Sequence, residues 1–201
     1  MARKGTVKRT TKGTVWVTLA LVGATSAVAV TPAQAAPAAR AAATACPTGW
    51  GSTVESRAAG TTESVTNVRT GRQACYDRMV VDVPGAGTSG LGYWVGYVDR
   101  LHQDGSGTVI PVAGGAILEV RVTAPAYDPE TGAPTYPARA GRPLPGVDLT
   151  GYRTFRDARF AGSFEGDTQI GLGLRARLPF RVLVLSDRVV VDVAHNWTGT
   201  R

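Results

Sequence analysis

The sequence lacks most of the side chains on which enzyme chemistry depends. Its 201 residues include only two histidines, His102 and His195, and two cysteines, Cys46 and Cys75. It has no Gly-x-Ser-x-Gly nucleophile motif, and neither histidine lies in a cluster of carboxylates at metal-ligand spacing. Asp104 opens an Asp-Gly-Ser-Gly stretch that lacks the rest of a calcium loop. The sequence therefore predicts no enzyme, no metal site and no cofactor.

Lysine is missing beyond residue 12, and the basic residues before that point form a pattern of their own. Five of them precede an apolar stretch at 15–30, which ends at Ala33-Gln34-Ala35. This order is typical of a secretory signal peptide. A membrane anchor is the weaker alternative, because the stretch is shorter than the roughly 20 apolar residues that span a bilayer. We expect a signal peptide at 1–35, a flexible Ala- and Pro-rich segment at 36–45, and one secreted domain at 46–201.

Removal of the signal peptide would leave 17 arginines and 15 acidic residues, a net charge of +2. The sequence pI of about 9.9 is therefore no argument for a nucleic-acid partner. Cys46 and Cys75 form an even pair in an exported chain, so a disulfide between them is the default interpretation. It would contribute about 3–4 kcal/mol in the chain-entropy model. A metal site or a catalytic thiol is the alternative.

Two segments that lie 110 residues apart are almost identical. Residues 77–83 read Asp-Arg-Met-Val-Val-Asp-Val, and residues 187–193 differ from them only at the third position. Both are rich in β-branched residues, and turn residues lie beside them. They predict two equivalent strands of an antiparallel fold.

Other segments alternate with the period of two that indicates strands buried on one face, at 118–123 and 170–177. In the second, Gly171, Gly173, Arg175 and Arg177 would face outward. Further strands are predicted at 93–98 and 180–185, with weaker candidates at 65–69 and 154–161. We predict an all-β fold, an antiparallel β-sandwich or a partly closed barrel of about 7–9 strands.

Six arginines between residues 153 and 181 would lie on neighbouring late strands, where they form either an anion site or a surface of ion pairs. Aromatic residues could stack on sugar rings or pack in the core. The candidate ligand-binding residues are Arg159, Arg175, Arg177, Arg181, Trp94 and Tyr127. Glu165 and Asp167 could act as the carboxylate pair of a hydrolase, but acids that flank Gly166 are better explained as hairpin-turn residues.

The connection at 124–151 is long and contains six prolines. Connections of this length are usually functional or disordered. Tyr127 and Tyr136 favour order, because such aromatic residues generally find something to pack against.

Several segments of the chain resemble the AMIN-like domain of secreted actinobacterial proteins. They are residues 75–82, 104–107, 124–128, 164–166, 175–181 and 191–195. The resemblance covers roughly residues 46–197 and implies a β-sandwich. The related AMIN domains of cell-wall amidases and secretins are non-catalytic modules that bind the cell envelope, notably peptidoglycan. No amidase or secretin domain accompanies this module in the sequence.

The leading hypothesis is a secreted, non-catalytic module that associates with the cell wall. Its partner would be peptidoglycan or another wall polymer, held by strand-face arginines and by the connection around Tyr127. The alternative is a protein-interaction module, either an inhibitor or a subunit of an envelope complex, which would use the 124–151 connection for recognition. A hydrolase that uses Glu165 and Asp167 is the third and weakest hypothesis.

Overall fold

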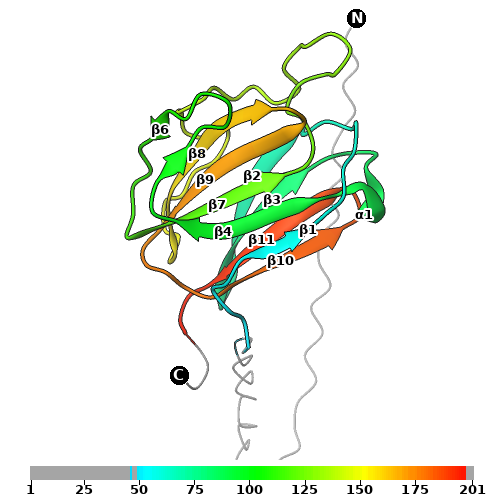
Figure 1. Ribbon diagram of the computed structural model, residues 1–201. Helices are drawn as coiled ribbons and strands as arrows, with labels where there is room; N and C mark the ends of the chain where they lie inside the picture. The colour runs from blue at the N-terminus through cyan, green and yellow to red at the C-terminus, as the bar shows by residue number, and fades with distance from the viewer. Residues whose placement is uncertain (1–45, 47–48, 198–201) are drawn as a thin grey trace, which may run out of the picture. The chain divides into compact units, whose positions relative to one another are not determined.

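The computed structural model describes residue 46 and residues 49–197 (Figure 1). The predicted signal peptide at 1–35 and the Ala- and Pro-rich segment at 36–45 lie outside the described residues. Eleven strands and one short helix are described: β1 Glu55–Arg57, β2 Asn67–Arg72, β3 Tyr76–Asp82, α1 Gly87–Gly90, β4 Tyr93–Val98, β5 Leu101–His102, β6 Val109–Ile110, β7 Ala116–Val122, β8 Phe155–Phe164, β9 Asp167–Leu174, β10 Phe180–Leu185 and β11 Arg188–Ala194. No helix among the described residues has the length and apolar character to cross a membrane.

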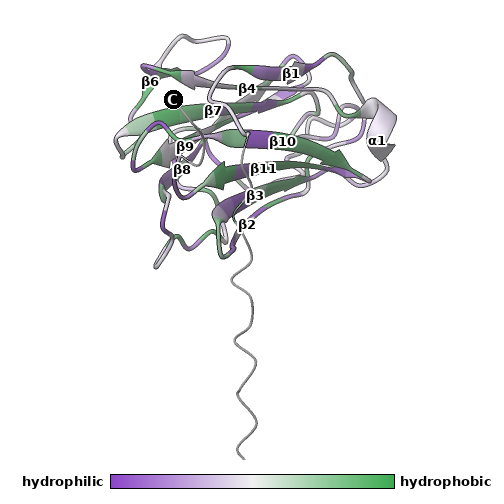
Figure 2. Cartoon of the chain, turned by 90° about the horizontal axis from the view of Figure 1, so that it is seen from below, coloured by the Kyte–Doolittle hydropathy of each residue, from purple (hydrophilic) through white to green (hydrophobic). Residues whose placement is uncertain are grey.

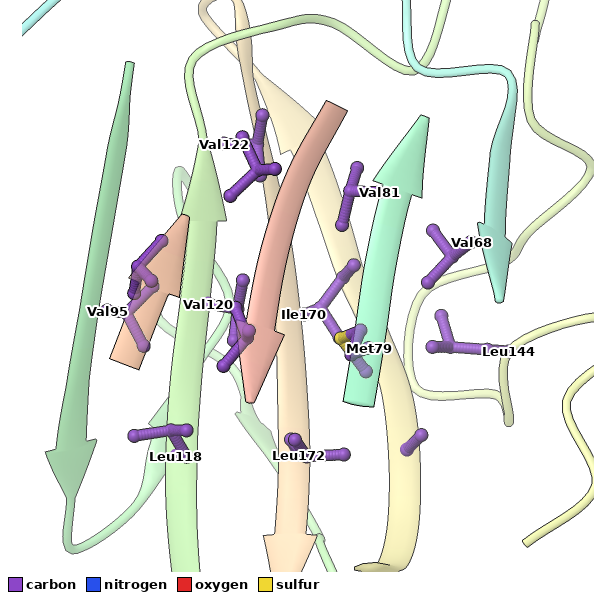
Figure 3. Close-up of a cluster of buried hydrophobic side chains, with 14 of the residues drawn as sticks. Val68, Met79, Val81, Val95, Leu118, Val120, Val122, Leu144, Ile170 and Leu172 are labelled. Atoms are coloured by element: carbon purple, nitrogen blue, oxygen red, sulfur yellow. The ribbon is translucent and has the colours of Figure 1, made fainter. Parts of the chain in front are cut away.

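Two antiparallel sheets form the sandwich that the sequence predicts. The five-stranded sheet has the order β1-β4-β7-β9-β8, and the four-stranded sheet has the order β10-β11-β3-β2. Their inner faces share one core of alternating apolar residues, including Met79, Val81, Val120 and Ile170 (Figure 3). Neither order closes on itself in the described part of the chain, so the fold is a sandwich and not a barrel.

The two nearly identical segments form neighbouring strands that pair with each other. β3 and β11 are antiparallel, with Val80 opposite Val190. Because the two segments are also 110 residues apart, a local twofold axis passes through this valine pair. The axis brings the arginine of each copy opposite an aspartate of the other, Arg78 opposite Asp192 and Arg188 opposite Asp82. The prediction of equivalent strands is confirmed, and the repeat builds the centre of one sheet.

The prediction that residues 170–177 form a strand buried on one face is wrong in two respects. β9 ends at Leu174, so Arg175 and Arg177 lie in the connection to β10. The outward face of β9 is also buried, because the short β5–β6 sheet covers it. A Cβ on Gly171 would lie 2.3 Å from the Leu101 side chain, and one on Gly173 would lie 1.9 Å from a backbone oxygen. Glycine is needed here because a second layer packs directly on the strand.

The 124–151 connection packs into the sandwich. Tyr136 and Leu144 are buried in the shared core. Backbone hydrogen bonds also attach this segment to the outer edge of β8, with Leu144 N donating to Ala158 O (3.0 Å) and Phe160 N donating to Arg142 O (3.1 Å). The connection therefore covers an edge that would otherwise be open to pairing with another chain.

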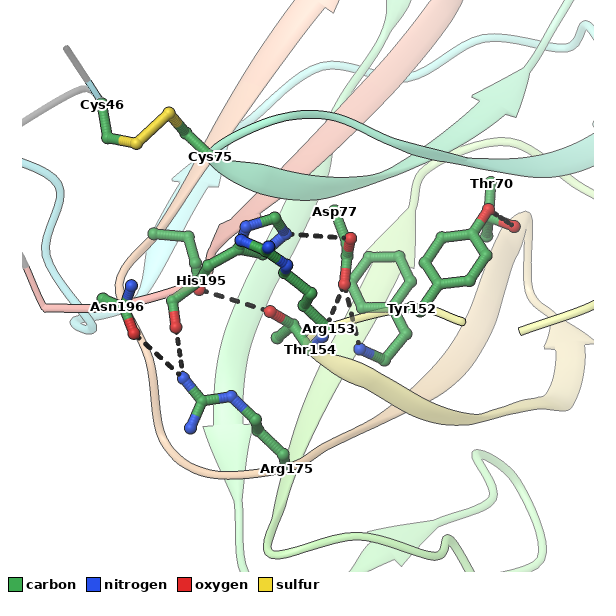
Figure 4. A network of polar contacts seen from close by, with 12 residues as sticks. Cys46, Thr70, Cys75, Asp77, Tyr152, Arg153, Thr154, Arg175, His195 and Asn196 are labelled. Atoms are coloured by element: carbon green, nitrogen blue, oxygen red, sulfur yellow. Dashed lines mark hydrogen bonds and ion pairs between the residues drawn. A yellow bond between two sulfur atoms is a disulfide. The ribbon is translucent and has the colours of Figure 1, made fainter. Parts of the chain in front are cut away.

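The predicted disulfide between Cys46 and Cys75 is present, and it lies beside a buried polar network (Figure 4). Asp77 is fully buried and accepts hydrogen bonds from the Thr154 backbone N–H (2.6 Å) and from His195 Nε2 (3.1 Å). The network ties β3, the segment before β8 and the end of β11 together. His195, which is 5% exposed, therefore has a structural role in this network.

Candidate functional site

The structure separates the four arginines that the sequence groups together. Arg159 lies on β8 and pairs with Asp157 (2.8 Å), whereas Arg181 lies on β10 in the other sheet and pairs with Asp192 (2.9 Å). Arg175 donates a hydrogen bond to the backbone oxygen of His195. The expectation that these arginines share neighbouring strands is wrong, because β8 and β10 belong to different sheets.

Arg177 lies at a cavity of its own. Its guanidinium lies 4.7 Å from the centre of the Tyr97 ring, and its Nη2 donates to the Ser52 backbone oxygen (2.9 Å). With Tyr97, Asp99 and others, Arg177 lines a cavity of about 380 Å³. Tyr127 lies away from these arginines. Its backbone pairs with Pro134 in an isolated β-bridge, and its backbone oxygen accepts a hydrogen bond from the Ser64 hydroxyl (2.8 Å).

Trp94 is the predicted site residue that has other candidate binding side chains beside it on neighbouring strands. It lies on the outer face of β4, directly opposite Arg121 of β7, which in turn lies opposite Gln169 of β9. The indole lies over Gly96, since a Cβ there would come within 2.8 Å of the Trp94 ring. A strand glycine thus makes room for a large aromatic side chain on the sheet surface.

Two adjoining cavities lie along this row of side chains. The first, of about 360 Å³, is lined by Tyr93, Trp94, Arg121, Thr123 and Asp167. The second, of about 320 Å³, is lined by Asp104, Gly105, Arg121, Phe164, Glu165 and Asp167. Because they share Arg121 and Asp167, we treat them as one groove, which we call the Trp94 groove.

A network of hydrogen bonds fixes the polar base of the Trp94 groove. Gln169, which is 1% exposed, donates to Glu119 Oε1 (2.9 Å) and accepts from the Asp104 backbone N–H (3.1 Å). Arg121 is held between Glu119 and Asp104, with 3.0 Å from its Nη2 to Asp104 Oδ1. The guanidinium therefore has a fixed position, and its centre lies 6.0 Å from the Trp94 ring.

Charges in the groove affect one another because the site is partly desolvated. Burial raises the pKa of Asp104 and the nearby Glu119 and Asp167 raise it further, although Arg121 opposes them. Burial would lower the pKa of Arg121, but its contacts with Glu119 and Asp104 leave that pKa above its ordinary value. The Arg121 guanidinium thus stays charged among several carboxylates.

Glu165 and Asp167 lie at one end of the groove. Glu165 and Gly166 form the two-residue turn between β8 and β9, both with positive φ, 49° and 86°. This is the hairpin chemistry that the sequence indicates. Among the described residues, no group of three or more His, Cys, Asp or Glu side chains is placed to hold a metal ion.

Sequence reasoning finds Trp94 but misses the residues that complete the groove, namely Arg121, Asp104, Glu119 and Gln169. The alternation at 118–123 places Glu119 and Arg121 outward, yet it does not reveal which strands flank them. The signal that was available is the pair of glycines at 171 and 173. Adjacent outward glycines indicate that another layer approaches this sheet.

A family model described as the AMIN-like domain matches residues 63–195, which include β2 to β11 and the whole Trp94 groove. Comparisons with curated proteins and with solved structures find no match. The segment that the family model matches is more than half of the 201-residue chain. On this match, the chain belongs to the AMIN-like domain family.

Proposed function

We propose that this chain is a non-catalytic module that binds cell-wall glycan, and that the Trp94 groove holds the sugar. The family suggests a role related to the cell wall. One observation carries the assignment to this groove: Trp94, Arg121 and Gln169 lie side by side across three strands, with the polar members already fixed.

The chemistry of the groove suits a sugar ring. The C–H face of a pyranose is apolar and stacks on an aromatic ring, whereas its hydroxyl groups need hydrogen-bond donors and acceptors at the edge. Trp94 offers the aromatic surface, and Arg121, Thr123 and Asp167 offer the polar groups in the same cavity. Since Arg121 is already held by Glu119 and Asp104, binding would cost little side-chain entropy.

The same geometry makes catalysis the weaker hypothesis. Glycoside hydrolysis needs one carboxyl group as acid and a second as base or nucleophile across the scissile bond. Glu165 is exposed and belongs to a tight turn. If the protein were nevertheless a hydrolase, Glu165→Gln would abolish the release of reducing ends from purified cell walls. We expect no such activity in the unmodified protein.

The alternative function is binding of a protein partner through the 124–151 connection. Much of that segment is attached to β8 and the core, so a partner would contact its longest exposed run, residues 129–134. A defined partner that co-purifies with the protein and is lost when 129–134 are shortened would favour this function over glycan binding.

The test of glycan binding replaces the aromatic surface and keeps the fold. Binding of β-1,4-linked N-acetylglucosamine oligosaccharides and of purified peptidoglycan is measured by calorimetry and by sedimentation. We expect Trp94→Ala to weaken binding about tenfold or more, and Trp94→Phe to weaken it less. Trp197→Ala is the matched control, because Trp197 is 56% exposed and lies outside the groove. Equal losses in the Trp94 and Trp197 variants would refute the assignment.

A further inference from the structure

The outer face of the four-stranded sheet carries an excess of arginine. Six ionised side chains point outward from β2, β3, β10 and β11, and we call them the arginine face: Arg69, Arg78, Arg181, Arg188, Asp82 and Asp192. Four guanidinium groups thus face two carboxylates. A face built only to pair its own charges would need half as many arginines.

Each aspartate is shared by two arginines. Asp192 has no exposed side-chain surface, and both Arg78 (2.6 Å) and Arg181 (2.9 Å) pair with it. Asp82 is shared in the same way by Arg69 (2.8 Å) and Arg188 (3.8 Å). Each group of three therefore keeps one positive charge in excess. The local twofold axis between β3 and β11 explains why the arrangement occurs twice.

Aromatic rings hold two of the guanidinium groups in place. Arg181 lies 4.4 Å from the centre of the Trp50 ring, and Arg78 lies 5.3 Å from that of Tyr76, whose hydroxyl oxygen also accepts from Arg78 Nη2 (3.3 Å). The hydrogen bonds and ion pairs of the four arginines use Nε and Nη2. Among the described residues, the Nη1 group of each arginine has no hydrogen-bond partner.

The spacing of the two groups suits a polymer. Arg78 and Asp82 are four residues apart on β3, so the two positive centres are separated by about 13 Å. Between them lie Val80 and Val190, which are 4% and 1% exposed and lie opposite Arg69 and Leu183 in the sheet. A single small anion would reach only one centre, whereas a chain with repeated charges would reach both.

We propose that the arginine face is a second binding site, whose ligand is a linear polyol phosphodiester polymer. Arginine binds phosphate oxygens through charge-assisted hydrogen bonds, and the free Nη1 groups are the donors. A phosphodiester keeps one charge per repeat at any ordinary pH. This site differs from the Trp94 groove in both its sheet and its ligand, so the protein would bind glycan and anionic polymer on opposite faces.

The decisive variant removes only the excess charge. Arg181→Gln together with Arg188→Gln leaves Arg78 with Asp192 and Arg69 with Asp82, so neither carboxylate loses its last partner. Arg139→Gln together with Arg142→Gln is the matched control. It changes the net charge equally, at two exposed positions of the 124–151 connection.

Binding of fluorescently labelled poly(glycerol phosphate) is measured by anisotropy over a series of salt concentrations. We expect the Arg181/Arg188 variant to bind at least about tenfold more weakly at low salt, with a shallower dependence on salt, because fewer counterions are released. The control variant should bind like the unmodified protein. Oligosaccharide binding in the Trp94 groove should be the same in all three proteins, so the two sites can fail independently.

Three results would overturn the proposal. The first is an unmodified protein with no affinity for the polymer. The second is an equal loss of affinity in both double variants, which would indicate unspecific charge attraction. The third is binding to vesicles with a phosphatidylglycerol surface and none to the polymer. That result would assign the arginine face to a membrane surface instead.

Discussion

The two outer faces of the sandwich are built in opposite ways. On the four-stranded sheet the outward residues include the six ionised side chains of the arginine face and the two valines between them. On the five-stranded sheet glycines replace large residues, and β5 and β6 pack on top (Figure 1). Hydrophobic positions predominate along β7 and β11, and hydrophilic positions interrupt β3 and β10 (Figure 2). The core is shared, so the difference lies entirely outside it.

The charges differ in the same way. Residues 46–197 contain 15 arginines and 15 acidic residues, so this part of the chain is neutral. Yet four arginines share two aspartates on one face, whereas Arg121 on the other is surrounded by Asp104, Glu119 and Asp167. The comparison teaches that net charge is a poor guide to the partners of this protein. Its separated charges favour different ligands on different faces.

The largest expected effect comes from removal of the disulfide. Cys46→Ser together with Cys75→Ser should lower the free energy of unfolding by about 3–4 kcal/mol, because the cross-link closes a loop of 29 residues. Chemical denaturation measures this loss. Trp50 lies just after the cross-link, so polymer binding at the arginine face should weaken in protein that is still folded. Unchanged stability, or an equal loss of oligosaccharide binding, would contradict this prediction.

The second-largest expected effect comes from a substitution on the outer face of β9, which the β5–β6 sheet covers. Gly173→Ala should lower the free energy of unfolding by about 2–3 kcal/mol, because the new Cβ would overlap the backbone oxygen of Ala113. Gly71→Ala is the control on the uncovered face, where the nearest atom beyond its neighbours is 3.8 Å away. It should be close to neutral. Similar melting temperatures for the two variants would mean that the second layer is not packed as described.

A smaller effect tests the two halves of the arginine face against each other. Asp192→Asn should cost about 1–2 kcal/mol, because it leaves two guanidinium groups side by side with no carboxylate between them. Asp82→Asn should cost less than about 1 kcal/mol, since that side chain is 18% exposed and better screened. Denaturant unfolding of the two single variants gives both values. The reverse order would show that burial of the carboxylate does not govern the energy of these ion pairs.

The smallest expected effect is on the stability of the fold at high pH. Burial raises the pKa of Tyr97 to about 12, opposed in part by its hydrogen bond to Leu178 and by Arg177. Because the folded state holds this proton more tightly than the unfolded state, the stability is complete below about pH 10. It is lost as the pH rises towards 12. Tyr97→Phe should reduce the slope of unfolding free energy against pH in this range. An unchanged slope would show that the Tyr97 hydroxyl is not the group that titrates.

The arginine face should keep its charge through the same pH range. Hydrogen bonds to Asp82 and Asp192 hold the pKa of Arg69 and Arg78 above the ordinary arginine value, although burial opposes them. Polymer binding should therefore persist at pH 10–11 for as long as the protein is folded. Titration of the labelled polymer at these pH values provides the measurement.

Much of the fold could be predicted because the strands alternate regularly. Residues 93–98 and 180–185 are β4 and β10, and the repeat gives β3 and β11. The partners of the strands could not be predicted, since alternation fixes which residues share a face and not which strands are neighbours. Arg175 and Arg177 continue the alternation of β9 beyond its end, so their placement on a strand was wrong. Trp94 was found, but Arg121 opposite it depends on the pairing of β4 with β7.

The pairing of β3 with its near-copy β11 also affects how the protein folds during synthesis. β11 is the last strand and lies between β10 and β3, so the four-stranded sheet is incomplete until residues 188–194 exist. The segment from Arg78 to Asp82 is complementary to itself, because an antiparallel pair of two such segments centred on Val80 again places arginine opposite aspartate. A partly synthesised chain therefore presents an edge that fits the same edge of another chain. We expect truncation before residue 188 to give dimers in which β3 of one chain pairs with β3 of the other.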